Sequence, residues 1–266
     1  MLALPLYDDS PKIRPPVVAA GLIAACTIVF LWQLSLDPQA SEEVSLSYGM
    51  VPAVLFGYAQ LPARLHAVPP AVTLITSMFL HGGFLHLLGN MLYLWIFGKG
   101  VESALGPVRF LLLYVLSGVA AALTQALTGL AVEVPMIGAS GAIAGVLGAY
   151  LVLRPRSKVV VLLWIIIFVR LITLPAVILL GIWFGLQLLS ALSMQPGEAG
   201  VAFWAHVGGF LAGMALVLVL RPPGVSIWQA RQTAPFAVAQ GRSADRRFGT
   251  GSVPQAGGRN PRNGWS

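Results

Sequence analysis

The stretch Val201–Leu220, VAFWAHVGGFLAGMALVLVL, is almost wholly apolar and contains no Asp, Glu, Lys or Arg. A helix needs about 20 predominantly apolar residues to cross the hydrocarbon core of a bilayer, so this segment is long enough to span a membrane. His206 lies near its start. A polar side chain inside such a span is rare and is a functional candidate by default.

The composition of the whole chain agrees with a membrane protein. Apolar residues make up 57% of the 266 positions and charged residues 9%, against about 25% charged residues in a soluble domain. The net charge of +7 comes without an aromatic-interleaved basic stretch or zinc-finger spacing, so we expect no nucleic-acid partner. The single cysteine, Cys26, excludes a disulfide within the chain.

We predict an all-α, polytopic membrane protein with six transmembrane helices. The predicted spans are about Val17–Leu36, Phe84–Gly100, Pro107–Gly129, Ser140–Leu153, Leu171–Leu192 and Val201–Leu220. The apolar run Val159–Val169 would be only about 16 Å long as a helix, which is too short to span, so we interpret it as interfacial or re-entrant. The expected domains are a cytoplasmic N-terminal segment (1–16), the six-helix domain (17–220) with a long outer loop (about 37–70), and a flexible basic cytoplasmic tail (221–266).

The positions of the charges favour six spans over seven. Six spans put most cations on one side, namely Lys12, Arg14, Lys99, Arg109, Arg154, Arg156, Lys158 and those of the tail. The other side keeps Arg64 with five acidic residues, Asp37, Glu42, Glu43, Glu133 and Glu198. Since cytoplasmic loops are enriched in Lys and Arg, we expect both termini to be cytoplasmic.

This topology brings polar residues from three predicted spans to a similar depth near the outer side. His86 and Asn90 begin the second span, Ser140 begins the fourth, and His206 lies one to two turns into the sixth. Small residues on two of these helices allow their backbones to approach closely. These packing glycines are Gly141, Gly145, Gly209 and Gly213.

Ser140 and His206 have the chemistry of a nucleophile and its base. A serine hydroxyl becomes reactive when an adjacent histidine removes its proton. At a helix N-terminus, the Ser140 N–H can stabilise an oxyanion together with His86 and Asn90. All four aspartates (Asp8, Asp9, Asp37 and Asp245) lie outside the predicted spans, which favours a Ser-His dyad over a triad and excludes an intramembrane aspartyl protease.

Three motifs in this order resemble the rhomboid family of intramembrane serine proteases: LHGGFLHLLGN (Leu80–Asn90), GASGA (Gly138–Ala142) and AHVGG (Ala205–Gly209). The similarity runs from about Thr73 to Leu220 and includes Glu102-x-x-x-Gly106. It implies a six-helix bundle whose active site opens to the outer side, with Ser140 as nucleophile, His206 as base, and His86 and Asn90 as oxyanion partners. His81 matches a loop histidine of many members.

The resemblance also implies transmembrane proteins as substrates, the lipid bilayer as surroundings and a bacterial inner membrane as location. Two departures stand out. Many members have an aromatic residue four positions after the serine, where this chain has Ala144, so Phe210 or Trp204 is the expected substitute support for the imidazole. A Trp-Arg pair of the first outer loop in some members is also absent between Asp37 and Pro70.

Two other functions remain open from the sequence. A non-catalytic rhomboid-like protein would bind transmembrane helices without cutting them, and Ala144 is the one feature that favours this reading. A small-solute transporter is disfavoured, because such carriers commonly hold Asp or Glu inside their spans. We expect no cofactor and no metal, since His81 and His86 are five residues apart and no HExxH motif or nearby cysteine accompanies them.

Overall fold

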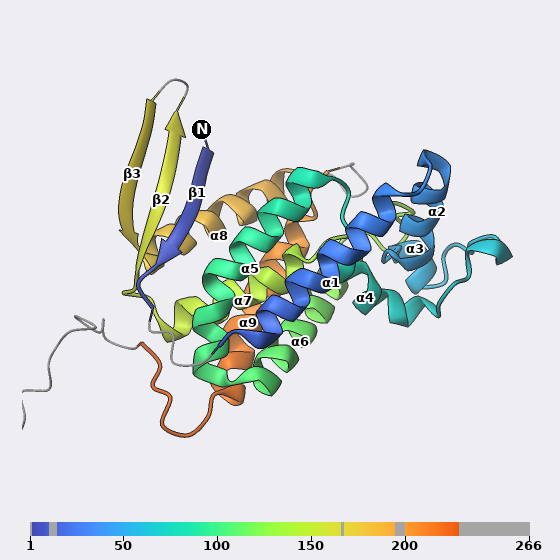
Figure 1. Cartoon of the computed structure of the whole chain (residues 1–266). Helices are drawn as coiled ribbons and strands as arrows, with labels where there is room; N and C mark the ends of the chain where they lie inside the picture. Colours follow the sequence, from blue (N-terminus) through green and yellow to red (C-terminus); the bar gives the residue numbers. More distant parts are fainter. Residues whose placement is uncertain (1, 11–14, 166–167, 195–199, 229–266) are drawn as a thin grey trace, which may run out of the picture. The chain divides into compact units, whose positions relative to one another are not determined.

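The computed structural model describes residues 2–10, 15–165, 168–194 and 200–228. The described part of the chain contains six long helices, which pack together (Figure 1). They are α1 (Val17–Leu34), α5 (Phe84–Leu105), α6 (Pro107–Leu127), α7 (Ser140–Leu153), α8 (Ala176–Ser193) and α9 (Phe203–Leu220). The predicted tail lies largely outside the described residues, from residue 229 onward.

The long helices have the length and composition of membrane spans. Four of them, α1, α6, α8 and α9, are apolar and long enough to cross a bilayer, and α5 is a fifth when the bent segment before it is included. The 14-residue α7 is a shorter apolar helix. The prediction of a polytopic helical membrane protein is therefore confirmed.

Besides the helices, the chain forms a three-stranded antiparallel sheet (Figure 1). Its strands are β1 (Leu2–Asp8), β2 (Lys158–Ile165) and β3 (Phe168–Pro175), in the order β1-β2-β3. The helical conformation assumed for Val159–Val169 is wrong, because this segment forms most of a β-hairpin; its position at the membrane interface stays a prediction. The fifth helix consequently begins at Ala176 and not at Leu171.

The two ends of the β2–β3 hairpin lie side by side, because Lys158 at the start of β2 pairs with Pro175 at the end of β3. The hairpin therefore adds no crossing to the six helices. In the predicted N-terminal segment, β1 pairs with β2 and carries Pro5, which a strand at the edge of a sheet tolerates. Asp8, at the end of β1, accepts a hydrogen bond of 2.7 Å from the Tyr150 hydroxyl of α7.

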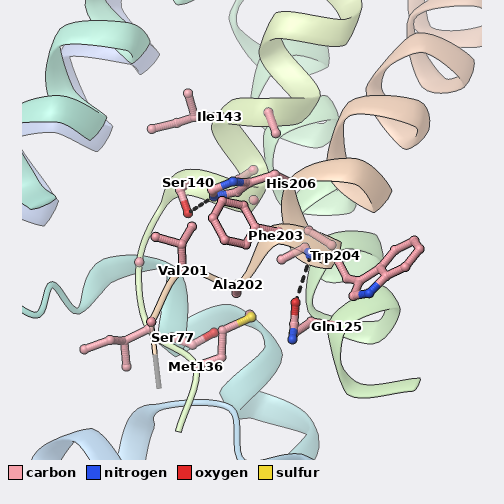
Figure 2. A pocket seen from close by; sticks show the side chains of 18 of the residues that line it. Ser77, Gln125, Met136, Ser140, Ile143, Val201, Ala202, Phe203, Trp204 and His206 are labelled. Atoms are coloured by element: carbon pink, nitrogen blue, oxygen red, sulfur yellow. Dashed lines mark hydrogen bonds between the residues drawn. The ribbon is translucent and has the colours of Figure 1, made fainter. Parts of the chain in front are cut away.

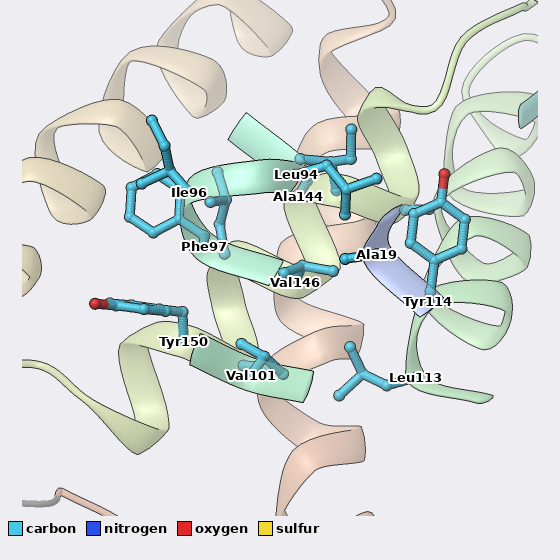
Figure 3. Packing of buried hydrophobic residues seen from close by; sticks show 14 of the residues in the cluster. Ala19, Leu94, Ile96, Phe97, Val101, Leu113, Tyr114, Ala144, Val146 and Tyr150 are labelled. Atoms are coloured by element: carbon cyan, nitrogen blue, oxygen red, sulfur yellow. The ribbon is translucent and has the colours of Figure 1, made fainter. Parts of the chain in front are cut away.

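The core forms around α7, whose side chains are almost all buried (Figure 3). Phe97 of α5 meets Tyr150 of α7 edge to face, with 5.0 Å between ring centroids. On the side toward α9, a Cβ atom at Gly209 would overlap the carbonyl oxygen of Gly141, and one at Gly213 would overlap that of Gly145. The absence of side chains at the two α9 glycines therefore sets the close approach of α7 and α9.

Glu102 fixes the start of α1. Its side chain is 1% exposed, and its two carboxylate oxygens accept hydrogen bonds from the N–H groups of Val18 (2.9 Å) and Ala19 (2.8 Å). A carboxylate at this place satisfies two N–H groups that lack partners within the helix and interacts favourably with the helix dipole. This buried acid therefore has a structural role.

Several short helices lie between α1 and α5, in the predicted outer loop (about 37–70) and in the residues that follow it. They are α2 (Pro38–Tyr48), α3 (Pro52–Leu55), η1 (Ala63–Leu65), η2 (Pro70–Val72), α4 (Thr73–Thr76) and η3 (Ser77–Phe79). Met50 and Met136 exchange two backbone hydrogen bonds, and the Gly138 N–H donates to the Ser77 carbonyl at 2.8 Å. These bonds anchor the segment that leads into Ser140.

Candidate active site

The side chains of Ser140 and His206 meet between α7 and α9 (Figure 2). The Ser140 Oγ lies 2.8 Å from the His206 Nε2, which is within the 2.6–3.2 Å range expected for a nucleophile and its base. His206 is only 8% exposed, whereas Ser140 is half-buried. The hydroxyl can therefore be reached while the imidazole is largely shielded.

Ser140 is the first residue of α7, and no side chain caps this helix end. The N–H groups of a first helical turn have no partners within the helix, and the dipole makes this end electropositive. On α9, the Ala205 N–H donates to Gln125 Oε1 of α6 at 3.2 Å, which fixes the backbone directly before His206. The start of α7 thus offers backbone N–H donors beside the Ser140 Oγ.

His86 and Asn90 lie one turn apart on α5 and face the backbone that precedes Ser140. A Cβ atom at Gly138 would lie 2.7 Å from His86 Cε1 and 3.9 Å from Asn90 Nδ2. Gly138 also has a φ of +124°, a conformation that favours glycine. Asn90 is 8% exposed, and its Nδ2 has no hydrogen-bond partner among the described residues, so this N–H₂ group can donate to a ligand.

His81 lies in the turn before α5 and contacts His86 edge to face, with 5.3 Å between ring centroids. Its backbone N–H donates to Gln33 Oε1 of α1 at 3.0 Å, and its Nδ1 lies 3.2 Å from the Phe79 carbonyl oxygen. His81 is therefore a buried neighbour of His86, and its hydrogen bonds stabilise the turn before α5.

Two residues of α8 contact the imidazole of His206. The Gln187 Oε1 lies 2.7 Å from Nδ1, and the Trp183 indole is tilted against the ring at 5.9 Å between centroids. Phe203 meets the imidazole edge to face at 6.3 Å. Gln187, Trp183 and Phe203 were not among the site residues predicted from the sequence, although the i, i+4 pair of Trp183 and Gln187 in an apolar span was a signal for two of them.

The two aromatic residues expected beside His206 lie elsewhere. Phe210 stacks on Phe184, with 4.7 Å between centroids, and also contacts Trp183. Figure 2 shows Trp204 pointing away from the imidazole. Aromatic support of His206 therefore comes from α8 and from the first turn of α9.

Ser140 and His206 open onto a cavity of about 720 Å³, within the size range of ligand sites. His86, Asn90 and Trp183 also line it, together with small residues such as Gly118 and Ala142. Its remaining walls are largely apolar. A cavity with this lining can hold a short extended segment of an apolar chain against the serine.

Comparison with known proteins gives the same family as the motifs. The family model described as "Rhomboid domain" matches residues 70–223. "RHOMBOID-like protein 5" of Arabidopsis thaliana is 38% identical over 152 residues, which are 56% of this chain and 44% of that protein.

Two relatives from Bacillus subtilis are named proteases. The "Putative rhomboid protease YdcA" is 42% identical over 78 residues, which are 29% of this chain and 39% of that protein. The "Rhomboid protease GluP" is 32% identical over 145 residues, which are 54% of this chain and 26% of that protein. The chain spans less than half the length of each of these three relatives. The family match over more than half of the chain shows that this integral membrane protein belongs to the rhomboid family.

Proposed function

We propose that this protein is an intramembrane serine endopeptidase in which Ser140 is the nucleophile and His206 the general base. The observation that carries the proposal is the 2.8 Å contact between Ser140 Oγ and His206 Nε2 at the wall of a cavity. Membership of a family that includes named proteases supports it.

In the acylation step, the Ser140 hydroxyl gives its proton to His206 Nε2 as Oγ bonds to the carbonyl carbon of the scissile peptide. The negative charge on the carbonyl oxygen is stabilised by the Ser140 N–H, by Asn90 Nδ2 and by His86. The imidazolium then gives its proton to the leaving amine, the C–N bond breaks, and an acyl-enzyme remains on Ser140.

In the deacylation step, a water molecule gives one proton to His206 and its oxygen bonds to the acyl carbon. The bond between that carbon and Ser140 Oγ breaks, and the imidazolium returns its proton to Oγ. The new carboxyl end leaves, and both side chains regain their starting states.

The substrates of this proposal are transmembrane segments of other membrane proteins. The apolar cavity wall and the position of Ser140 at the end of α7 both suit a segment that unwinds at the edge of the bilayer. The positive-inside distribution of Lys and Arg supports an orientation with cytoplasmic termini and a cavity that opens to the outer side, which in a bacterial cell would be the periplasmic side of the inner membrane.

The test is cleavage of a reporter with a Gly/Ala-rich transmembrane segment in proteoliposomes. We expect the wild-type protein to release a defined fragment, and Ser140→Ala and His206→Ala to release none while still unfolding at the wild-type temperature. Cleavage that continues with Ser140→Ala would refute the proposed nucleophile.

The alternative is a non-catalytic rhomboid-like protein that only binds transmembrane helices, and Ala144 favours it. Trp183 and Phe203 weaken that argument, because they supply the aromatic contact that Ala144 cannot. A wild-type protein that captures the reporter without cutting it would support the alternative.

A further inference from the structure

Gln187 and Ser140 contact different nitrogen atoms of the His206 imidazole ring. The Gln187 Oε1 is 2.7 Å from Nδ1, while Nε2 is 2.8 Å from the Ser140 Oγ. An amide oxygen can only accept a hydrogen bond, so this contact is a hydrogen bond in the tautomer of His206 that carries its proton on Nδ1. The other ring nitrogen, Nε2, is then the acceptor that faces the serine hydroxyl.

This arrangement selects one of the two neutral tautomers of His206. With the proton on Nδ1, Nε2 has a free lone pair and can take the serine proton. With the proton on Nε2, the ring could only donate to Ser140, and the hydroxyl would not be activated. The hydrogen bond to Gln187 therefore favours the reactive form of the dyad.

Contact with lipid favours a neutral amide over a charged carboxylate at position 187. In the part that the structure describes, α8 is the least buried of the four long spans, with 17% of its apolar window buried against 28–44% in the others. An ionised carboxylate on a helix so exposed to lipid is costly. A glutamine orients the ring without adding a charge.

Gln187 is separated from the substrate cavity. Trp183, one turn earlier on the same helix, lines the cavity, and Gln187 is not among its lining residues. The side chain is half-buried behind the imidazole. Its effect on the reaction must therefore pass through His206.

We propose that Gln187 is a positioning residue that holds His206 in the Nδ1-protonated tautomer and makes the Ser140–His206 pair dependent on the position of α8. This inference rests on the proposed protease function for its kinetic consequences, but the tautomer itself can be observed without activity. Among the described residues, the other titratable side chains that line the cavity are His86 and Tyr93, both on α5.

The kinetic test compares three variants in proteoliposomes with the reporter substrate. Gln187→Leu removes the acceptor at similar size, and we expect kcat to fall about tenfold with KM within about twofold of wild type. Gln187→Glu retains an acceptor, so kcat should recover, and the acid limb of the kcat profile should move to higher pH because a carboxylate favours the protonated imidazole. The control is Leu186→Ala, an exposed neighbour on α8, which should match wild type.

The structural test is ¹⁵N NMR of the histidine-labelled protein, with the His206 signals assigned from His206→Ala. We expect a protonated Nδ1 in the wild type and in Ser140→Ala, and a mixture of tautomers in Gln187→Leu. A wild-type His206 with an unprotonated Nδ1 would overturn the inference even if Gln187→Leu failed to fold.

The outcomes separate this inference from the protease assignment. Normal kcat and an unchanged tautomer in Gln187→Leu, with cleavage still dependent on Ser140, would overturn the role of Gln187 alone. An equal loss of kcat in Leu186→Ala would also overturn it, by making the effect a general one of α8. A wild-type protein without any cleavage would refute the protease function, while the NMR result would still decide the tautomer.

Discussion

The indole of Trp183 lies 5.9 Å from the imidazole of His206 between ring centroids, with the two planes inclined by 36°. Ala144, where many rhomboid proteases have an aromatic residue, is fully buried in the core cluster (Figure 3). The aromatic neighbours of the imidazole are thus carried by α8 (Trp183) and by the first turn of α9 (Phe203), and not by the helix of the serine. The orientation of His206 therefore depends on how α8 packs.

Replacing Trp183 tests this dependence. We expect Trp183→Ala to lower kcat about two- to tenfold, because an aromatic pair contributes about 0.5–1.5 kcal/mol beyond the burial of its area. Trp183→Phe should retain most of the rate. Trp95→Ala on α5 is the matched control, since this side chain is 44% exposed and lies under Lys99. Equal rates for Trp183→Ala and wild type would contradict the supporting role.

Gly138→Ala should abolish activity and lower the thermal stability. The added methyl group would lie 2.7 Å from His86 Cε1, and the φ of +124° is strained for any residue with a side chain. Such a backbone conformation costs about 1–3 kcal/mol, and His86 would be displaced from the serine. Gly21→Ala, which has open space around it, should keep full activity. Reporter cleavage and thermal unfolding in detergent measure both effects.

Gly209→Ala should separate α7 from α9, because its methyl group would overlap the Gly141 carbonyl oxygen. Overpacking of this kind costs about 1–3 kcal/mol, and activity should fall as the Ser140–His206 distance grows. Gly185→Ala on α8 meets no atoms within 4 Å and is the control. If both variants unfolded at the same temperature, the tight contact between α7 and α9 would be refuted.

Glu102→Gln should destabilise the start of α1 without touching the active site. The amide keeps one oxygen, so one of the two N–H groups of Val18 and Ala19 loses its charged acceptor. We expect a loss of about 1–3 kcal/mol in the free energy of unfolding. Glu133→Gln, an exposed position, should leave the unfolding temperature unchanged. An equally small effect of both substitutions would argue against this helix cap.

Much of the helical fold could be predicted from apolar length alone. The starts of α5 at Phe84, α6 at Pro107 and α7 at Ser140 agree with the predicted spans, because a glycine or proline lies at each start or within two residues before it. The proximity of Ser140 and His206 could also be predicted, because the six-span topology puts both residues at a similar depth near the outer side of the membrane. Their catalytic roles stay predictions until activity is measured.

The sheet could not be predicted from the same signal. A continuous apolar run such as Val159–Val169 fits a buried strand or a helix equally well by periodicity, and β1 pairs with β2 from about 150 residues away along the chain. Gln187 and Trp183 were missed for a related reason. Their importance depends on which face of α8 meets α9, and this is set by tertiary packing.

The most direct measurement of the central claim is peptide mapping by mass spectrometry after reaction with a fluorophosphonate, which bonds to an activated serine oxygen. The account predicts one adduct, on Ser140, in the wild-type protein and its loss in His206→Ala. An adduct on another residue, or labelling of Ser140 that is undiminished in His206→Ala, would contradict the activation of this serine by this histidine.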